Sequence, residues 1–243
     1  MHSPNWSGAV LIQGKGEAGN EPFDSVWATW VVPKLKIPKG ELGEWRSASW
    51  VGLDGGEGHG WSKDVLQAGI EQCVTLEKDG TITEDYHVFY GWDPGNGSNT
   101  YTVKGFPVDA GDLIQVKVQY LNNRGFARFV NHTKKVEISE WIPKPVNVGF
   151  KGDTAEWIVE RLFKRPKHKR PEHKRPEEQY YQLADFGVME FVHAGGLATN
   201  YAHIGPALGD LCIMCSDENG ENLIAEAGMP DDRSVRITWK SSH

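Results

Sequence analysis

The feature of this sequence that most constrains its fold is a succession of short apolar or alternating runs, each ended by Gly, Pro, Asn or Asp. Such runs are typical of β-strands joined by turns. One of them, "LIQVKVQYL", alternates as a strand with one solvated face does. We therefore expect an all-β antiparallel sandwich or barrel. The expected strands are residues 8–12, 25–32, 47–53, 64–69, 86–92, 112–121, 126–131, 154–163, 184–192, 211–216 and 234–240.

The chain of 243 residues is long enough to bury a large core, and we expect a single domain over residues 1–243. Its formal net charge of -7 argues against nucleic-acid binding, which needs Lys and Arg to neutralise phosphates. No apolar run approaches the roughly 20 residues that span a bilayer, so no membrane partner is expected. The start of the chain, "MHSPNWSGAV", has no signal-peptide pattern.

The cysteines and histidines do not form a metal-binding pattern. Of the three cysteines, Cys212 and Cys215 have C-x-x-C spacing, but no second pair completes a zinc site and no βαβ pattern indicates a redox motif. We interpret them as small buried strand residues, and the odd count leaves one thiol, such as Cys73, without a partner in the chain. The sequence "GKGEAG" precedes an expected strand rather than the helix of a dinucleotide site. No metal and no cofactor is predicted.

Residues 164–178, "KRPKHKRPEHKRPEE", form a basic, Pro-rich segment that looks inserted between two strands. Seven Lys and Arg against three Glu give this segment a net charge of +4. Its prolines favour an extended chain and its charges favour solvent. Two interpretations remain open: a solvated loop, or an arm that docks on an anionic surface or on the protein's own acidic face.

Two expected strands carry a polar side chain among apolar neighbours: Gln67 in "DVLQAG" and Glu156 in "DTAEWIVE". Alternate strand residues share a face, so Glu156 and Glu160 point the same way, opposite to Trp157. Burying an amide or a carboxyl group is costly unless it is paired. Each residue alone has an ordinary explanation, as an amide bonded to a neighbouring backbone or as a partly solvated carboxylate.

Five motifs follow one another in the order "NWSGAV" at 5–10, "WVGLDG" at 50–55, "LQAG" at 66–69, "FYGWDP" at 89–94 and "AEWIVE" at 155–160. This set resembles the glutamic peptidases, or eqolisins, which are acid-acting endopeptidases known mainly from fungi. The resemblance implies a jelly-roll or lectin-like β-sandwich of two large antiparallel sheets. It also implies that Gln67 and Glu156 are the catalytic pair, and that Trp6, Trp50, Asp54 and Tyr90 line the substrate cleft. For the three aromatic residues the alternative is core packing, and for Asp54 a turn.

The chemistry of peptide hydrolysis suits this pair. A carboxylate takes a proton from water and later passes it to the leaving amine. A primary amide donates to the developing oxyanion without changing its own charge. One such donor contributes about 3–4 kcal/mol. A model Glu has a pKa of about 4.3, so the base is partly ionised in mild acid.

The sequence departs from the resemblance at several points. Fungal members typically read "YDAWYEWYP" where this chain reads "YHVFYGWDP", so His87 stands at an Asp position and Gly91 at a Glu position. The 26 Lys and Arg would leave the chain strongly positive at low pH. The pH optimum is therefore expected to be less acidic than the family implies.

Our leading hypothesis is a secreted, monomeric acid endopeptidase that acts on protein or peptide substrates without a metal. The second hypothesis is a carbohydrate-binding, lectin-like sandwich whose Trp residues stack on sugar rings. A glycosidase on the same architecture would need two carboxylates flanking the scissile bond, and a Gln/Glu pair argues against it. A homologue that has lost activity and serves only in binding is a further alternative, although both positions of the implied catalytic pair are intact.

Overall fold

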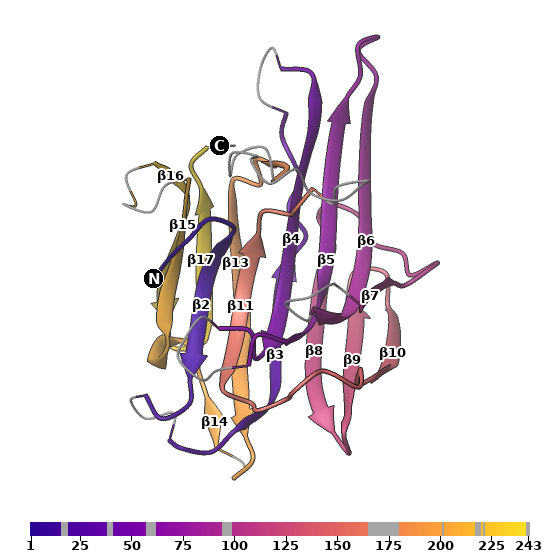
Figure 1. Ribbon diagram of the computed structural model, residues 1–243. Coiled ribbons are helices and arrows are strands. Elements are labelled where there is room, and N and C mark those ends of the chain that lie inside the picture. Colours follow the sequence, from indigo (N-terminus) through magenta and orange to yellow (C-terminus); the bar gives the residue numbers. More distant parts are fainter. Residues whose placement is uncertain are drawn as a thin grey trace.

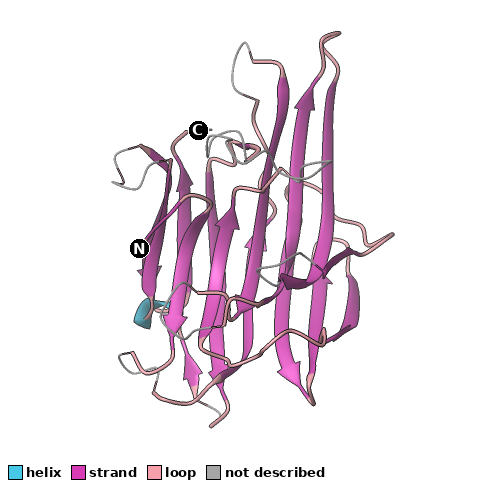
Figure 2. Cartoon of the chain, viewed as in Figure 1, coloured by secondary structure: helices cyan, strands magenta, loops and turns pink. Residues whose placement is uncertain are grey.

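The structure is a computed structural model that describes residues 1–15, 19–37, 41–56, 62–93, 99–164, 180–200, 202–216, 220 and 222–241. These residues form seventeen β-strands and one short 3-10 turn, η3 (Pro206–Leu208). Figure 2 shows that strands dominate the described chain. No helix in the described ranges is long and apolar enough to cross a membrane. The all-β prediction is confirmed.

The first sheet carries both polar strand residues that the sequence analysis identified. Its neighbouring strands pair antiparallel. In order across the sheet they are β15 (Asp210–Cys215), β2 (Trp6–Ile12), β11 (Thr154–Glu160), β4 (Gly43–Leu53), β5 (Val65–Leu76), β6 (Ile82–Asp93) and β7 (Asn99–Thr102). The short β12 (Gln182–Leu183) joins the start of β4 as a parallel partner.

The second sheet lies behind the first, and its strands run in nearly the same direction (Figure 1). Its strands are β14 (His203–Ile204), β13 (Val188–Ala198), β3 (Phe23–Val31), β8 (Leu113–Leu121), β9 (Arg124–Asn131) and β10 (Val136–Pro143). One side of the sandwich is closed by β1 (His2–Ser3), β16 (Leu223–Asp231) and β17 (Ser234–Trp239), which connect β15 to β13. The expected antiparallel sandwich of two large sheets is therefore observed.

Most expected strands are present, with shifted ends. The strand containing Gln67 continues to Leu76 and forms a long hairpin with β6. The strand expected at 184–192 begins only at Val188, because Gly187 adopts φ +67 and its N–H donates to the Asp185 carboxylate. Strands β10 and β16 were not expected from the sequence. Cys212 and Cys215 are buried in β15, as interpreted above.

The main core fills the space between the two sheets. Along β11, Ala155, Trp157 and Val159 enter this core, whereas Ile158 packs into a separate cluster on the outer face of the first sheet. The alternation expected for this strand is thus confirmed. The Trp157 indole Nε1 donates to the Trp27 carbonyl oxygen at 2.9 Å, a hydrogen bond that joins the two sheets.

The basic segment predicted at 164–178 falls almost wholly outside the described residues, of which only Lys164 belongs to it. Its two interpretations, a solvated loop or a docking arm, stay predictions. The single-domain organisation over 1–243 likewise stays a prediction.

We predict that Trp157→Phe lowers the free energy of unfolding by about 2–4 kcal/mol, because it removes both the inter-sheet donor and buried volume. Urea denaturation would measure the loss. Trp141→Phe is the control, since Trp141 is 48% exposed on β10, and it should cost less than about 1 kcal/mol. Equal losses in the two variants would contradict the inter-sheet role of Trp157.

Candidate active site

Gln67 and Glu156 lie in one row across the outer face of the first sheet. Strand β4 runs between their two strands, and its Gly52 is the register partner of both residues. Directly paired residues in an antiparallel sheet project from the same face. Two strand spacings separate the backbones of Gln67 and Glu156 by about 10 Å. The pairing therefore directs the amide and the carboxyl group over the same short stretch of β4.

Gly52 keeps the space between the two side chains free of a third one. A Cβ atom at this position would lie 2.7 Å from Cζ3 of Trp50 and 3.2 Å from Cγ1 of Val65. These distances are shorter than normal carbon–carbon contacts, so the position has no room for a larger residue. The gap between Gln67 and Glu156 is bounded by the Trp50 ring and the Val65 side chain.

Both candidate catalytic side chains are buried without the partners that burial normally requires. Gln67 is 5% exposed and Glu156 is fully buried. Within the described ranges, neither carboxylate oxygen of Glu156 forms a hydrogen bond, and neither does Oε1 of Gln67. Buried polar atoms are nearly always paired in proteins. Three unpaired oxygens in one row therefore mark a place where a ligand or water is expected to bind.

The surroundings of Glu156 favour its protonated form. Burial raises the pKa of this carboxyl group well above its ordinary value, and the nearby Asp54 carboxylate raises it further. The Thr154 hydroxyl acts in the opposite direction and lowers this pKa, although it forms no hydrogen bond within the described residues. Burial therefore shifts the titration of Glu156 toward its uncharged form.

Asp54 connects this row to the segment that precedes β11. It follows β4 in a turn with φ +64 and is fully buried. Its carboxylate accepts the N–H of Lys151 at 2.8 Å and the N–H of Asp153 at 2.7 Å. Burial raises the pKa of Asp54 to about 6, although these backbone donors lower it. Asp54 is thus a turn residue that also fixes the backbone leading into β11 and Glu156.

Trp6 and Trp50 meet on the same outer face, with ring centroids 5.0 Å apart in an edge-to-face arrangement. Next to them lies Glu160, the last residue of β11, which the sequence analysis did not select as a site residue. The Trp50 indole Nε1 donates to Glu160 Oε2 at 2.9 Å, and burial raises the pKa of this carboxyl group to about 7. The shared strand parity of Glu156 and Glu160 was the signal that could have identified it.

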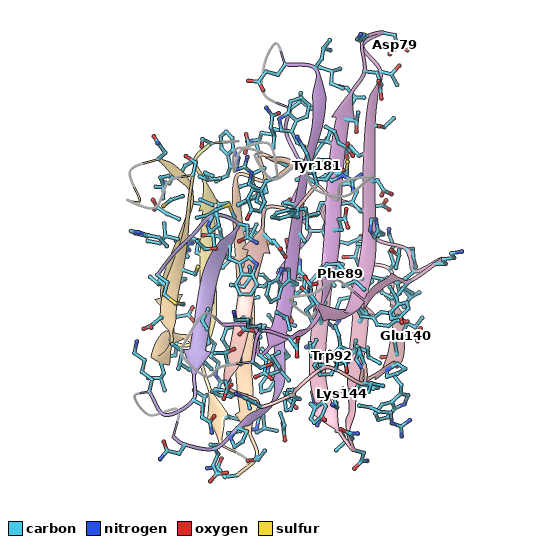
Figure 3. The ribbon with its side chains drawn as sticks, viewed as in Figure 1. Asp79, Phe89, Trp92, Glu140, Lys144 and Tyr181 are labelled. Atoms are coloured by element: carbon cyan, nitrogen blue, oxygen red, sulfur yellow. The ribbon has the colours of Figure 1, made fainter. Side chains whose placement is uncertain are left out.

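Tyr90 does not join this group. It pairs with Ala68, whose side chain enters the main core, whereas Gly91 pairs with Gln67. Figure 3 labels two neighbours of Tyr90 on β6: Phe89 belongs to the outer cluster and Trp92 to the main core. Tyr90 shares the face of Trp92 and its ring lies 5.7 Å from that of Tyr101. The structure therefore places this expected substrate contact on the opposite face of the sheet from Gln67.

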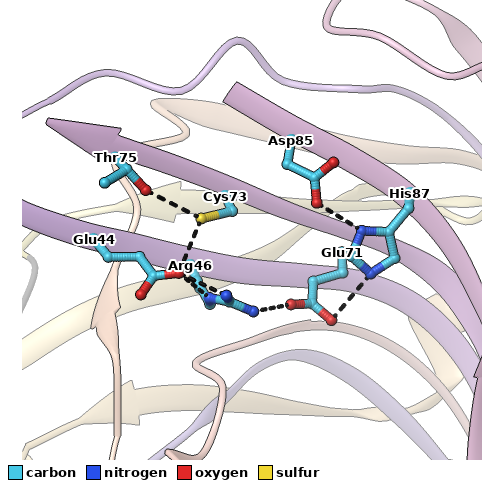
Figure 4. A network of polar contacts seen from close by, with 7 residues as sticks. All are labelled: Glu44, Arg46, Glu71, Cys73, Thr75, Asp85 and His87. Atoms are coloured by element: carbon cyan, nitrogen blue, oxygen red, sulfur yellow. Dashed lines mark hydrogen bonds and ion pairs between the residues drawn. The ribbon is translucent and has the colours of Figure 1, made fainter. Parts of the chain in front are cut away.

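A charged network continues along the same outer face of β4, β5 and β6 (Figure 4). Arg46 bonds Glu71 at 2.7 Å and Glu44 at 2.6 Å. His87 lies 3.4 Å from Glu71 and 3.0 Å from Asp85, and the Glu71 contact raises the pKa of His87. His87 is thus held between two carboxylates of this network.

The fold and this row of residues define a class of protein: a β-sandwich whose candidate active site pairs a carboxamide with a carboxyl group on the outer face of one sheet. The described side chains include no group of three or more His, Cys, Asp and Glu suited to a metal ion.

The family model of the Peptidase A4 family matches residues 4–239, so this chain belongs to the A4 peptidases, the glutamic peptidases or eqolisins. The resemblance inferred from the five motifs is confirmed at the level of the family, and membership makes the chain a peptidase. A search of curated proteins gave no match.

Solved structures with the same fold include scytalido-glutamic peptidase with a transition state analog inhibitor. It has a TM-score of 0.72 and 20% identity over 98% of this chain and 99% of that one. SCP-B, an eqolisin in complex with the tripeptide Ala-Ile-His, has a TM-score of 0.68 and 20% identity over 98% of this chain and 99% of that one. Aspergilloglutamic peptidase from Aspergillus niger has a TM-score of 0.60 and 24% identity over 81% of this chain and 99% of that one.

The buried carboxyl groups predict how stability depends on pH. A carboxyl group whose folded-state pKa is raised stabilises the fold below its unfolded pKa, and this stabilisation is lost as pH rises through the folded pKa. For Asp54 this window runs from 3.8 to about 6, and for Glu160 from 4.5 to about 7. We predict that the free energy of unfolding falls between pH 3.8 and 7, by about 3 kcal/mol from Asp54 alone.

Urea denaturation at steps between these pH values would measure the slope. Asp54→Asn cannot titrate, so it should flatten the slope even though it lowers stability overall. Asp232→Asn, in an exposed turn, is the control and should leave the slope unchanged. Stability that is constant or rises over this interval would contradict the role of buried carboxyl groups.

Proposed function

We propose that this chain is an acid-acting endopeptidase and that Gln67 and Glu156 are its catalytic pair. The observation that supports this most directly is the register of β11, β4 and β5, with Gly52 between the two side chains. Three unpaired buried oxygens on these side chains support a bound water or substrate at the same place.

In the proposed reaction, the Glu156 carboxylate removes a proton from a water molecule, whose oxygen attacks the carbonyl carbon of the scissile peptide bond. The Gln67 amide N–H donates to the carbonyl oxygen as it becomes an oxyanion. The protonated Glu156 then delivers its proton to the amide nitrogen. The C–N bond breaks, and the carboxyl and amine products leave with the enzyme restored.

The outer face supplies the rest of the proposed substrate site. Trp6 is partly exposed and, packed against the buried Trp50 ring, provides an aromatic surface beside the row that suits an extended peptide. Asp54 acts as a positioning residue for the backbone before Glu156, in place of the direct substrate contact first expected of it. We give Tyr90 no direct contact with substrate, since it lies on the opposite face. Scytalido-glutamic peptidase with a peptide based transition state analog and SCP-B with a tripeptide support a peptide ligand at such a site.

We further propose that the enzyme is secreted and monomeric, that it acts without a metal or other cofactor, and that it has no nucleic-acid or membrane partner. The lectin-like alternative is less favoured, because sugar stacking would not require an unpaired Gln/Glu row beside the two indoles.

We predict that Gln67→Ala lowers kcat on an unfolded protein substrate about 10²- to 10³-fold, because one oxyanion donor is lost. Glu156→Gln keeps the shape of the side chain but removes the base, and it should lower kcat by at least about 10²-fold. Both effects would be measured in acidic to neutral buffers.

Gln72→Ala is the matched control for Gln67. Gln72 is also a buried glutamine of β5, but it bonds Ser49 at 2.8 Å on the inner face. This variant should keep its kcat once folding is verified. The mechanism fails if the wild type cleaves nothing, or if either catalytic variant keeps full activity.

We also predict where the acid limb of the pH profile lies. Because the pKa of Glu156 is raised, kcat/KM should decline as pH falls through a midpoint above the ordinary Glu value of about 4.3. Steady-state assays across pH 3–8 would locate this midpoint, with buffer ionic strength held constant. A limb at or below the ordinary value would show that Glu156 is not the base in the free enzyme.

A further inference from the structure

Glu160 is a buried titratable residue to which the proposed reaction assigns no role. It ends β11 and projects from the same face as Glu156, since the two residues are four positions apart on one strand. Its register partners are Trp6 on β2 and Ala48 on β4. Glu160 is therefore placed at the base of the two aromatic side chains beside the catalytic row.

Three donors surround this carboxylate. The Trp50 indole donates to Oε2 at 2.9 Å, and the Asn5 amide Nδ2 donates to Oε1 at 3.3 Å. The Trp6 indole also lies close enough to favour the charged form of Glu160. Asn5 is itself fixed, because its side-chain oxygen accepts the Ser3 hydroxyl and its carbonyl accepts the Arg161 N–H.

The charge of Glu160 is held by neutral donors rather than by a cation. The described residues include no Lys or Arg in an ion pair with it, and the neighbouring Arg161 guanidinium donates to the Tyr181 carbonyl oxygen at 2.8 Å. Asp93 adds a like charge. A partly buried carboxylate without a cation is costly, so Glu160 depends on its neutral donors, and the Trp50 indole forms the shorter of the two hydrogen bonds described above.

Trp50 links Glu160 to the row that contains Gln67 and Glu156. Its ring edge borders Gly52, where a Cβ atom would lie 2.7 Å from Cζ3. At Gly69, the next glycine of the outer face on β5, a Cβ atom would lie 2.5 Å from the Trp50 Cβ. The ring edge thus lies over Gly52 and the Trp50 Cβ lies over Gly69, while the indole Nε1–H points to Glu160. A small rotation of the ring would move its edge into the gap between Gln67 and Glu156.

We propose that Glu160 is a positioning residue that holds the Trp50 indole, and with it Trp6, as a preformed wall beside Gln67 and Glu156. This inference rests on the proposed function, since the wall has a purpose only if peptide is cleaved at that row. Without the acceptor, the Trp50 N–H is a buried donor without a partner, and the ring no longer has one preferred orientation. Misplacement of a substrate by 1 Å can cost about 10²-fold in rate.

The structural part of the inference can be tested without any assay of activity. In the ¹H–¹⁵N spectrum, the indole N–H signal of Trp50 is assigned by its loss in Trp50→Phe. This signal should shift as pH is raised through the titration of Glu160, and in Glu160→Gln the shift should disappear. The indole of Trp45, on the inner face of the same strand and without a partner among the described residues, is the internal control.

Other charged groups near Glu160 must be separated in the same experiment. Asp93 is the neighbouring carboxylate, Glu156 lies farther along the strand, Glu71 lies two strands away in the same row, and Arg161 follows in sequence. Asp93→Asn should change the midpoint of the Trp50 titration but not abolish it. A Trp50 signal that does not move with pH, or that titrates unchanged in Glu160→Gln, overturns the proposal.

Kinetics then test the consequence for the reaction. We expect Glu160→Leu to lower kcat/KM about 10- to 100-fold, mostly through KM. Trp50→Phe keeps the ring but lacks the N–H, and the Glu160→Leu/Trp50→Phe double variant should be no worse than Glu160→Leu alone. Glu160→Gln, which keeps an acceptor oxygen, should recover most of the loss. Glu226→Leu, on β16, should have no effect.

Additive losses in the double variant would mean that Glu160 acts by another route. Failure of the proposed function gives a different result. If the wild type cleaves no peptide, but the Trp50 signal still follows Glu160, then the contact exists and only its catalytic purpose is refuted.

Discussion

The structure of the site depends on the register of three neighbouring strands. Because Gly52 of β4 pairs with Gln67 on one side and with Glu156 on the other, an amide and a carboxyl group from distant parts of the chain are directed over one glycine. A slip of one residue in either pairing would turn one of these side chains into the main core. The apolar alternation on β11 resists such a slip, since Trp157 enters the core and bonds the opposite sheet.

Burial without cationic partners gives this face its electrostatic character. Asp54, Glu156 and Glu160 all have raised pKa values because burial penalises their charged forms. Elsewhere on the same face, Arg46 and His87 contact Glu71 in the network along β4, β5 and β6. Protonated carboxyl groups are neutral, so the fold tolerates them best in acid. The same burial that makes Glu156 a poised proton acceptor therefore also favours a molecule that is stable below neutral pH.

The aromatic residues show how a family resemblance and a structure contribute differently. The resemblance placed Trp6, Trp50 and Tyr90 together in a cleft. The strand parity of β6 separates them, because Tyr90 shares the inner face with Trp92 while Gly91 occupies the row of Gln67. The sequence motifs do not explain why Trp6 and Trp50 lie where they do. In the structure, both indoles lie against the Glu160 carboxyl group.

The sequence by itself determined the all-β class, the alternation within each strand and the identity of the unusual polar residues, because periodicity and composition are local properties of the chain. It did not determine that Gln67 and Glu156 share one row, that Asp54 holds the backbone before β11, or that Glu160 binds Trp50. These contacts join residues about 90 to 110 positions apart. Only strand pairing across the finished sheet brings them together, since register is fixed by the packing of both faces and not by either strand alone.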